Sequence, residues 1–212
     1  MLYMSMDRKM ELPRPNKDNF RLNPTKAEMQ KQIEEARTQK GKVILEIGPG
    51  ESLGVEVKKN DVYIGVEPYS SSKQLKDRVN RANPEAKINL VENAYTLPDF
   101  APDLMLMVAP NPNDIEDGIL FDYEGKFNQA KGIVIALDTR TREATSGSGV
   151  KGLVQKIRSD FREMGIKDFN AARCRTNISG LMDEVGMEGY RGSLESSADI
   201  GHEAVVIYAS KF

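Results

Sequence analysis

Short apolar runs recur along the chain from residue 43 onward, and mixed polar segments separate them. The runs lie at 43–47, 62–66, 88–91, 104–109, 133–137 and 204–209. Apolar runs this short and continuous are typical of strands buried on both faces, as in a parallel sheet. The pattern therefore predicts a sheet whose strands are mostly parallel.

The segments between these runs have helical periodicity. Residues 70–81 carry Leu75 and Val79 four positions apart, and residues 150–164 place apolar side chains on one stripe. The alternation predicts an α/β fold with a doubly wound, mostly parallel, seven-stranded sheet and right-handed crossovers. Residues 181–210 predict a helix followed by a C-terminal antiparallel hairpin.

The first forty residues differ from the rest of the chain in pattern. They begin with a proline-containing stretch without periodicity, which predicts an extended arm. The residues from Thr25 to Glu28 then resemble a capping box, and good helix formers follow until Gly41. We therefore divide the chain into an N-terminal arm and helix, 1–40, and a Rossmann-like domain, 41–212.

Composition narrows the class of protein. The 212 residues are 39% apolar, no apolar run approaches the length of a membrane span, and the N-terminus has no apolar signal segment. The single cysteine, Cys174, excludes an intramolecular disulfide framework and suits a reducing compartment. We expect a cytoplasmic protein that binds no membrane, and its oligomeric state is left open.

The charge balance bears on the partner. Thirty basic residues stand against 32 acidic ones, a net charge of −2, whereas nucleic-acid binders usually have a basic excess. The N-terminal arm does carry a local bias, with Arg8, Lys9, Arg14, Lys17, Arg21 and Lys26. That arm is either a solvated segment or a contact for phosphates.

Candidate chemistry begins where the first apolar run ends, at Glu46-Ile47-Gly48-Pro49-Gly50. Glycines at a strand-to-helix turn let the backbone approach a ligand closely and present N–H groups to it. Glu67 follows the second run, 17 residues past Gly50, where a carboxylate can accept both hydroxyls of a ribose. Together the two elements predict a nucleoside site.

The spacing of the glycines discriminates between nucleosides. A dinucleotide site requires Gly-x-Gly-x-x-Gly, but Leu53 occupies the third glycine position and Gly54 comes one residue late. An acid two residues before the first glycine, as Glu46 is here, is a feature of adenosylmethionine sites. An NAD(P)-binding enzyme remains an alternative, because the distance from Gly50 to Glu67 also suits it.

Four segments, 43–50, 63–68, 91–98 and 103–110, resemble successive motifs of class I S-adenosylmethionine-dependent methyltransferases. The similarity covers roughly residues 41–138. It implies methyltransferase activity with S-adenosyl-L-methionine as cofactor. The cofactor-binding residues that the resemblance implies are Glu46, Gly48, Pro49, Gly50, Glu67, Pro68, Asn93, Ala94, Ala109 and Pro110.

The resemblance also assigns roles. Glu46 would organise the glycine loop and hold the amino-acid end of the cofactor, often through water. The glycines would contact the methionine part, Glu67 the ribose and Asn93-Ala94 the adenine, while Ala109 and Pro110 would lie beside the transferring methyl group. The chain departs from the family at Ser52, which replaces a third glycine, and at Asn93, which replaces an acid.

The turn after the fourth motif, Asn111-Pro112-Asn113-Asp114, is the segment that would contact the methyl acceptor. It resembles the Asn/Asp-Pro-Pro-aromatic motif of enzymes that methylate nitrogen, and also the Pro-Asp-Pro-Trp of tRNA guanine methyltransferases, but it matches neither fully. A plain turn rich in Pro and Asn is the alternative. We take Asn111 and Asp114 as the candidate catalytic residues.

Other reactive side chains carry weaker signals. His202, the only histidine, and Cys174 have no partner at catalytic spacing, and no cluster has the spacing of zinc ligands. The sequence thus predicts a methyltransferase acting on a small or peptide-like acceptor. Two alternatives stay open: a tRNA or rRNA methyltransferase that uses the basic arm, and a non-catalytic Rossmann-like domain that binds a partner.

Overall fold

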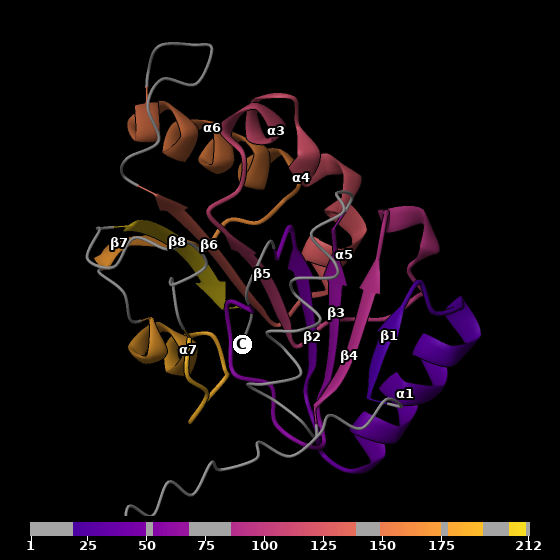
Figure 1. Cartoon of the computed structure of the whole chain (residues 1–212). Helices are drawn as coiled ribbons and strands as arrows, with labels where there is room; N and C mark the ends of the chain where they lie inside the picture. The colour runs from indigo at the N-terminus through magenta and orange to yellow at the C-terminus, as the bar shows by residue number, and fades with distance from the viewer. Residues whose placement is uncertain are drawn as a thin grey trace, which may run out of the picture.

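The computed structural model describes residues 19–49, 53–67, 86–138, 149–174, 178–192 and 204–210. In this part of the chain, eight strands form one sheet in the order β1-β4-β3-β2-β5-β6-β8-β7 (Figure 1). The strands are β1 (Phe20–Leu22), β2 (Val43–Ile47), β3 (Val62–Val66), β4 (Lys87–Val91), β5 (Leu104–Val108), β6 (Gly132–Asp138), β7 (Asn170–Cys174) and β8 (Ala204–Ser210). β8 runs antiparallel to both of its neighbours, and the other pairs are parallel.

The described helices are mostly short. They are α1 (Lys26–Thr38), the 3-10 helix η1 (Ala94–Thr96), α3 (Pro112–Glu116), α4 (Ile119–Asp122), α5 (Glu124–Gln129), α6 (Gly149–Glu163) and α7 (Ser179–Glu184). Helices α1, α4, α5 and α6 contribute to the core on one face of the sheet, and α7 contributes to the core on the other (Figure 1). None of them is long and apolar enough to cross a membrane.

The predicted α/β architecture with an antiparallel C-terminal pair is confirmed, and each apolar run coincides with a strand. The order predicted for residues 181–210 is wrong, because the edge partner of β8 is β7, which comes before α7 and not after it. Strands β2, β3 and β5 are buried along their whole length, as continuous apolar runs require. The helix predicted from 150 begins one residue earlier, at Gly149. The helix predicted over 70–81 and most of the loop 139–149 lie outside the described residues.

Two strands, β1 and β7, have no apolar run in the sequence that predicts them. β1 comes from the predicted extended arm and extends the sheet to eight strands. β7 has the sequence Asn-Ala-Ala-Arg-Cys and alternates between exposed and half-buried positions. An edge strand of this kind lacks the apolar run by which the buried strands are recognised.

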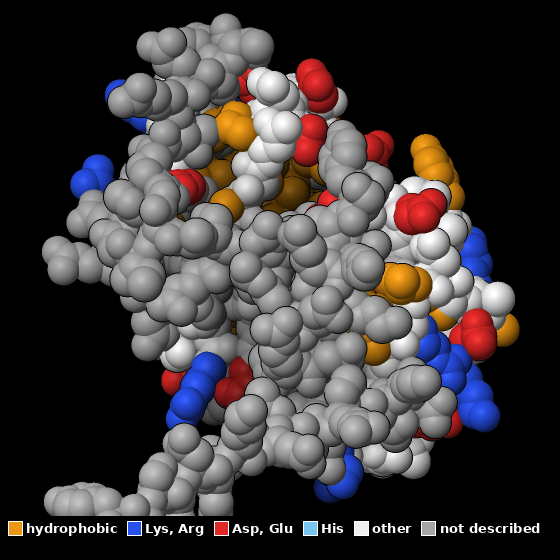
Figure 2. Space-filling view, in the orientation of Figure 1, with side chains coloured by type: hydrophobic (Ala, Val, Ile, Leu, Met, Phe, Trp, Pro, Cys, Tyr) orange, Lys and Arg blue, Asp and Glu red, His pale blue; other side chains and the backbone are white. Residues whose placement is uncertain are grey.

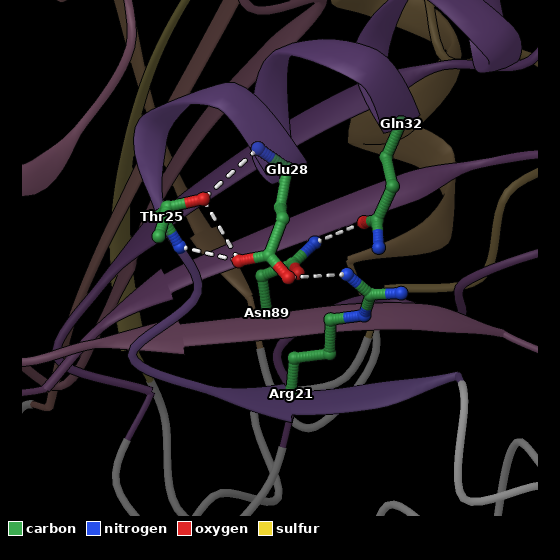
Figure 3. Close-up of polar contacts among 5 residues, drawn as sticks. All are labelled: Arg21, Thr25, Glu28, Gln32 and Asn89. Carbon is green, nitrogen blue, oxygen red and sulfur yellow. Dashed lines mark hydrogen bonds and ion pairs between the residues drawn. The ribbon is translucent and has the colours of Figure 1, made fainter.

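Local side-chain chemistry explains why the N-terminal segment turns from strand into helix. The Thr25 hydroxyl accepts a hydrogen bond from the Glu28 backbone N–H at 3.2 Å, and the Glu28 carboxylate accepts one from the Thr25 backbone N–H at 2.8 Å (Figure 3). This is the capping box that the sequence predicts, and α1 begins at the next residue, Lys26. Arg21 on β1 also pairs with Glu28, at 3.2 Å.

A buried amide pair joins the same helix to the sheet. The Asn89 side chain on β4 donates a hydrogen bond to Gln32 Oε1 on α1 at 2.6 Å (Figure 3). Both side chains are buried among apolar neighbours. Because a buried amide without a partner is costly, this contact favours one position of α1 on the sheet.

We expect Thr25→Ala to lower the free energy of unfolding by about 1 kcal/mol, since the side-chain half of the capping box is lost. Urea unfolding followed by circular dichroism measures the change. Thr25→Ser keeps the hydroxyl and serves as the control, with a stability close to that of the native protein. Equal losses in the two variants would contradict a role for the hydroxyl.

Candidate functional site

The sheet has one place where chain connections leave in opposite directions. From β2 the chain continues to β3 on one side, while β5 pairs with the other side of β2. Ligands of open α/β sheets bind in the crevice outside the carboxyl ends of the strands at such a switch point. The candidate site is therefore expected beyond Ile47, the last residue of β2.

A cavity of about 570 Å³ lies there. Its floor is apolar and comes from the ends of three neighbouring strands, at Ile47, Val66 and Met107. The rest of the described lining is Gly48, Glu67, Glu92, Asn93, Ala94, Tyr95, Ala109, Pro110, Asn111, Asp114, Ile119, Asp122 and Tyr123. Figure 2 shows the recess as a hydrophobic hollow with acidic side chains gathered around it.

Most residues singled out from the sequence meet in this cavity, although they span more than sixty positions of the chain. Those that line it are Gly48, Glu67, Asn93, Ala94, Ala109, Pro110, Asn111 and Asp114. Glu46 and Pro49 do not line it. Gly50 and Pro68, together with Ser52, lie outside the described residues.

Two backbone positions on the wall have left-handed conformations. Gly48 has φ +66°, and a Cβ placed on it would meet no atom within 4 Å. Ala109, just after β5, has φ +48°, which costs a non-glycine residue roughly 1–2 kcal/mol. Strain of this kind tends to concentrate at functional sites. Gly48 thus leaves open space beside the cavity floor.

Glu46 lies on the opposite face of β2 from the cavity. Successive side chains of a strand point to opposite faces, and the neighbouring Ile47 is the one that lines the cavity. Glu46 is fully buried, and its Oε2 accepts hydrogen bonds from the Tyr63 hydroxyl at 2.6 Å and from the Gly54 N–H at 3.1 Å. It therefore ties the end of β2 to the far end of the glycine loop, while Oε1 has no hydrogen-bond partner.

Pro49, within the glycine loop, is also buried. A Cβ on Gly65 would lie 3.0 Å from Pro49 Cγ and 2.7 Å from Leu90 Cδ2. β3 therefore needs glycine at this position so that the loop can pack closely on the sheet. Pro49 therefore packs close to β3 at Gly65 and does not line the cavity.

Asn111 determines the geometry of the turn after β5. Its Oδ1 accepts a hydrogen bond from the Asn113 N–H at 3.0 Å, and its main-chain oxygen accepts one from the Asp114 N–H at 3.1 Å. Asn111 is thus the N-cap of α3, with Pro112 at the first helical position. Asp114 lies one turn further along on the cavity side.

Several lining residues had escaped the sequence analysis. Tyr95 is 88% exposed at the rim of the cavity, and it stands within a segment that resembles the family. Asp122 is the last residue of α4 and Tyr123 is its C-cap, and this helix is too short to be predicted from the periodicity of apolar residues. Burial, and then the nearby Asp122 carboxylate, raise the pKa of the Tyr123 hydroxyl. The phenol is therefore a neutral donor in the wall.

A second cavity of about 370 Å³ adjoins the first and shares Ala94, Asp122 and Tyr123 with it. Its wall includes Lys126, whose ammonium group donates to the main-chain oxygens of Pro98 and Phe100, each at 2.9 Å. These bonds fix the loop between η1 and β5. Lys126 thus supports the shared wall.

Of the other reactive side chains considered from the sequence, Cys174 does not line this cavity. Cys174 is half-buried on the edge strand β7, and His202 lies outside the described residues. Among the described residues, no group of three or more His, Cys, Asp or Glu side chains could hold a metal ion.

Solved structures with similar folds include the cyclopropane-fatty-acyl-phospholipid synthase-like protein from Lactobacillus casei. It matches at 8% identity with a TM-score of 0.50, over 86% of this chain and 90% of that chain. The O-methyltransferase from Bacillus cereus in complex with SAH matches at 15% identity and a TM-score of 0.45, over 89% and 82% of the two chains. Precorrin-6y C5,15-methyltransferase from Geobacter metallireducens matches at 15% identity with a TM-score of 0.46, over 86% of this chain and 88% of that chain.

The likeness to the Lactobacillus casei protein is one of fold, and it agrees with the Rossmann-like arrangement predicted from the sequence. No protein-family model matches the chain, and no curated protein matches its sequence.

The burial of Glu46 makes stability depend on pH. Burial raises the pKa of Glu46 to about 7 from an ordinary value of 4.5, against the lowering effect of the hydrogen bonds from Tyr63 and Gly54. Between these two values the folded protein holds a proton that the unfolded chain releases. Glu46 therefore lowers the free energy of unfolding as the pH rises through this window.

We expect Glu46→Gln, which stays neutral, to gain stability relative to the native protein by up to about 3 kcal/mol across this window. Urea unfolding of both proteins at about pH 5 and about pH 8 measures the change. Tyr63→Phe removes a hydrogen bond that favours the ionised carboxylate and should steepen the loss of stability. A stability difference between Glu46→Gln and the native protein that is the same at both pH values would contradict the prediction.

Proposed function

We propose that this chain is an S-adenosylmethionine-dependent methyltransferase whose acceptor is a small molecule or a peptide-like substrate. The observation that carries the proposal is the cavity at the switch point of the sheet. Eight of the residues that the sequence motifs single out come together in its wall, from the ends of β2, β3, β4 and β5. These residues come from separate segments of the chain, and a surface depression without a function would not be expected to bring them together.

The wall offers features that fit the adenosyl donor. Gly48 leaves space that a Cβ would fill, which suits a ligand lying close to the backbone. Glu67 follows β3 and presents a half-buried carboxylate, an acceptor suited to ribose hydroxyls. Asn93 and Ala94 follow β4 and would hold the adenine. The donor would supply a methyl group on a positively charged sulfur, ready for displacement.

The protein's own part in such a reaction is alignment and the exclusion of water. Holding a nucleophile in line with the methyl group can remove up to ~7–11 kcal/mol of the barrier. The apolar floor of Ile47, Val66 and Met107 provides a dry surface for this alignment. Ala109 and Pro110, at the end of β5, would border the reacting methyl group.

The charge of the wall supports a small or peptide-like acceptor over a nucleic acid. Glu67, Glu92, Asp114 and Asp122 line the cavity, and its described lining contains no Lys or Arg. A strand of nucleic acid brings phosphates, which such a wall repels and which binders usually neutralise with basic side chains.

Binding of the donor and of its demethylated product, S-adenosylhomocysteine, tests the proposal by isothermal titration. We expect both to bind, and Glu67→Ala to weaken binding by about 1–3 kcal/mol, since charge-assisted hydrogen bonds to the ribose are lost. Glu56→Ala is the matched control, because Glu56 is exposed and lies outside the cavity lining.

No binding of either compound by the intact protein would defeat the enzyme hypothesis and would favour a non-catalytic domain. Unchanged affinity in Glu67→Ala would show that the ribose lies elsewhere.

A further inference from the structure

The ionisable groups of the cavity wall have one sign. Apart from two tyrosines, the ionisable side chains of the described lining are the carboxylates of Glu67, Glu92, Asp114 and Asp122. A cleft lined by one sign of charge concentrates ligands of the opposite sign, because its low-dielectric walls focus the field. The adenosyl donor brings one net positive charge, so it leaves most of this negative charge unbalanced.

These four carboxylates differ in how far they are already engaged. Glu92 Oε1 accepts a hydrogen bond from the Asn23 side chain at 3.0 Å, and Glu67 is the residue proposed to hold the ribose. Asp114 and Asp122 form no hydrogen bond or ion pair with another described side chain. Among the described lining residues, the carboxylates without such a partner are therefore on α3 and α4.

The turn after β5 decides which group can accept a hydrogen bond from a substrate. The side-chain oxygen and the main-chain oxygen of Asn111 already accept bonds from the turn of α3 itself. Its amide nitrogen is left as a donor. Asp114 follows three residues later, on the same side of the helix and half-buried in the cavity wall. The carboxylate of Asp114 is thus the acceptor beside Pro110.

We propose that the methyl acceptor is an amine whose nitrogen binds against the carboxylate of Asp114, with Asp122 adding to the attraction at the mouth of the cavity. The inference rests on the proposed function and names the substrate class of the same site. An ammonium group supplies the positive charge that the described lining lacks, together with N–H donors for the Asp114 carboxylate. Phenolates and carboxylates would bring like charge to it.

Methyl transfer to an amine needs only a nitrogen lone pair and the loss of one proton. The ammonium gives up one proton to water before transfer, which leaves a nitrogen lone pair, and the Asp114 carboxylate accepts a hydrogen bond from an N–H that remains. That lone pair forms the new N–C bond while the methyl–sulfur bond breaks and its electron pair stays on sulfur, giving a neutral thioether. The alkylated ammonium product, which the Asp114 carboxylate holds by a charge-assisted hydrogen bond, then leaves.

Binding to the complex with S-adenosylhomocysteine tests this inference without relying on turnover. The probes are n-butylamine, n-butanol and butyrate, which share a carbon chain and differ in charge, with N-acetyl-lysine methylamide as the peptide-like amine. We expect the amines to bind and the other two to bind at least about tenfold more weakly, the effect of one charge-assisted contact. The two amines separate a free small-molecule source from a lysyl side chain.

Asp114→Asn keeps the size of the side chain and removes its charge. We expect it to weaken amine binding about tenfold or more while leaving the affinity for S-adenosylhomocysteine within about twofold. Asp117→Asn, at the exposed end of α3 and outside the lining, is the matched control and should change neither affinity. Transfer of labelled methyl to the amine that binds gives a second readout, and Asp114→Asn should lower its kcat/KM.

Three results would overturn the inference. They are equal binding of the amine, the alcohol and the carboxylate, absence of amine binding at millimolar concentration, and amine binding that Asp114→Asn leaves unchanged. In each case the binding of S-adenosylhomocysteine would still stand. Loss of that binding in the native protein would instead be a failure of the proposed function, so the two failures are distinct.

Discussion

The backbone hydrogen bonds that join β2 to β3 on one side and to β5 on the other determine where a ligand can bind. Because all three strands are parallel, their carboxyl ends lie at one edge, with Ile47 level with Val66 and Glu46 level with Leu106. The connections leave this edge in opposite directions, so the space between them is not filled by a crossover. The residues that follow the different strands then meet in one cavity, although the strands are distant from one another in sequence.

Because side chains alternate along β2, the last two residues of the strand contact different faces of the sheet. Ile47 faces the cavity, and Glu46 faces the opposite core, where Tyr63 and Gly54 hold it. Those bonds join the end of β2 to Gly54, and Glu46 does not line the cavity. A carboxyl buried in this way stabilises one position of the loop at a cost in stability that develops as the pH rises from 4.5 to about 7.

Sequence reasoning works here where burial and periodicity agree. The continuous apolar runs locate β2 to β6 and β8, and the capping box locates the start of α1, because both signals depend on neighbouring residues alone. It fails where tertiary contact decides: β7 is an exposed edge strand, and β1 exists because the arm pairs with β4. Likewise Asp122 and Tyr123 reach the cavity only through the path of α3 and α4, which no motif records. The sequence thus predicts the lining residues that directly follow the strands better than those on the short helices.

The central claim is that the cavity at the switch point binds the adenosyl donor, and a crystal structure with S-adenosylhomocysteine tests it most directly. The account predicts the ribose within hydrogen-bond distance of Glu67, the adenine beside Asn93 and Ala94, and the sulfur directed toward Pro110 and Asp114. The volume left past the sulfur would then measure the acceptor. Ligand density at any other place on the protein, or none at saturating concentration, would contradict the account.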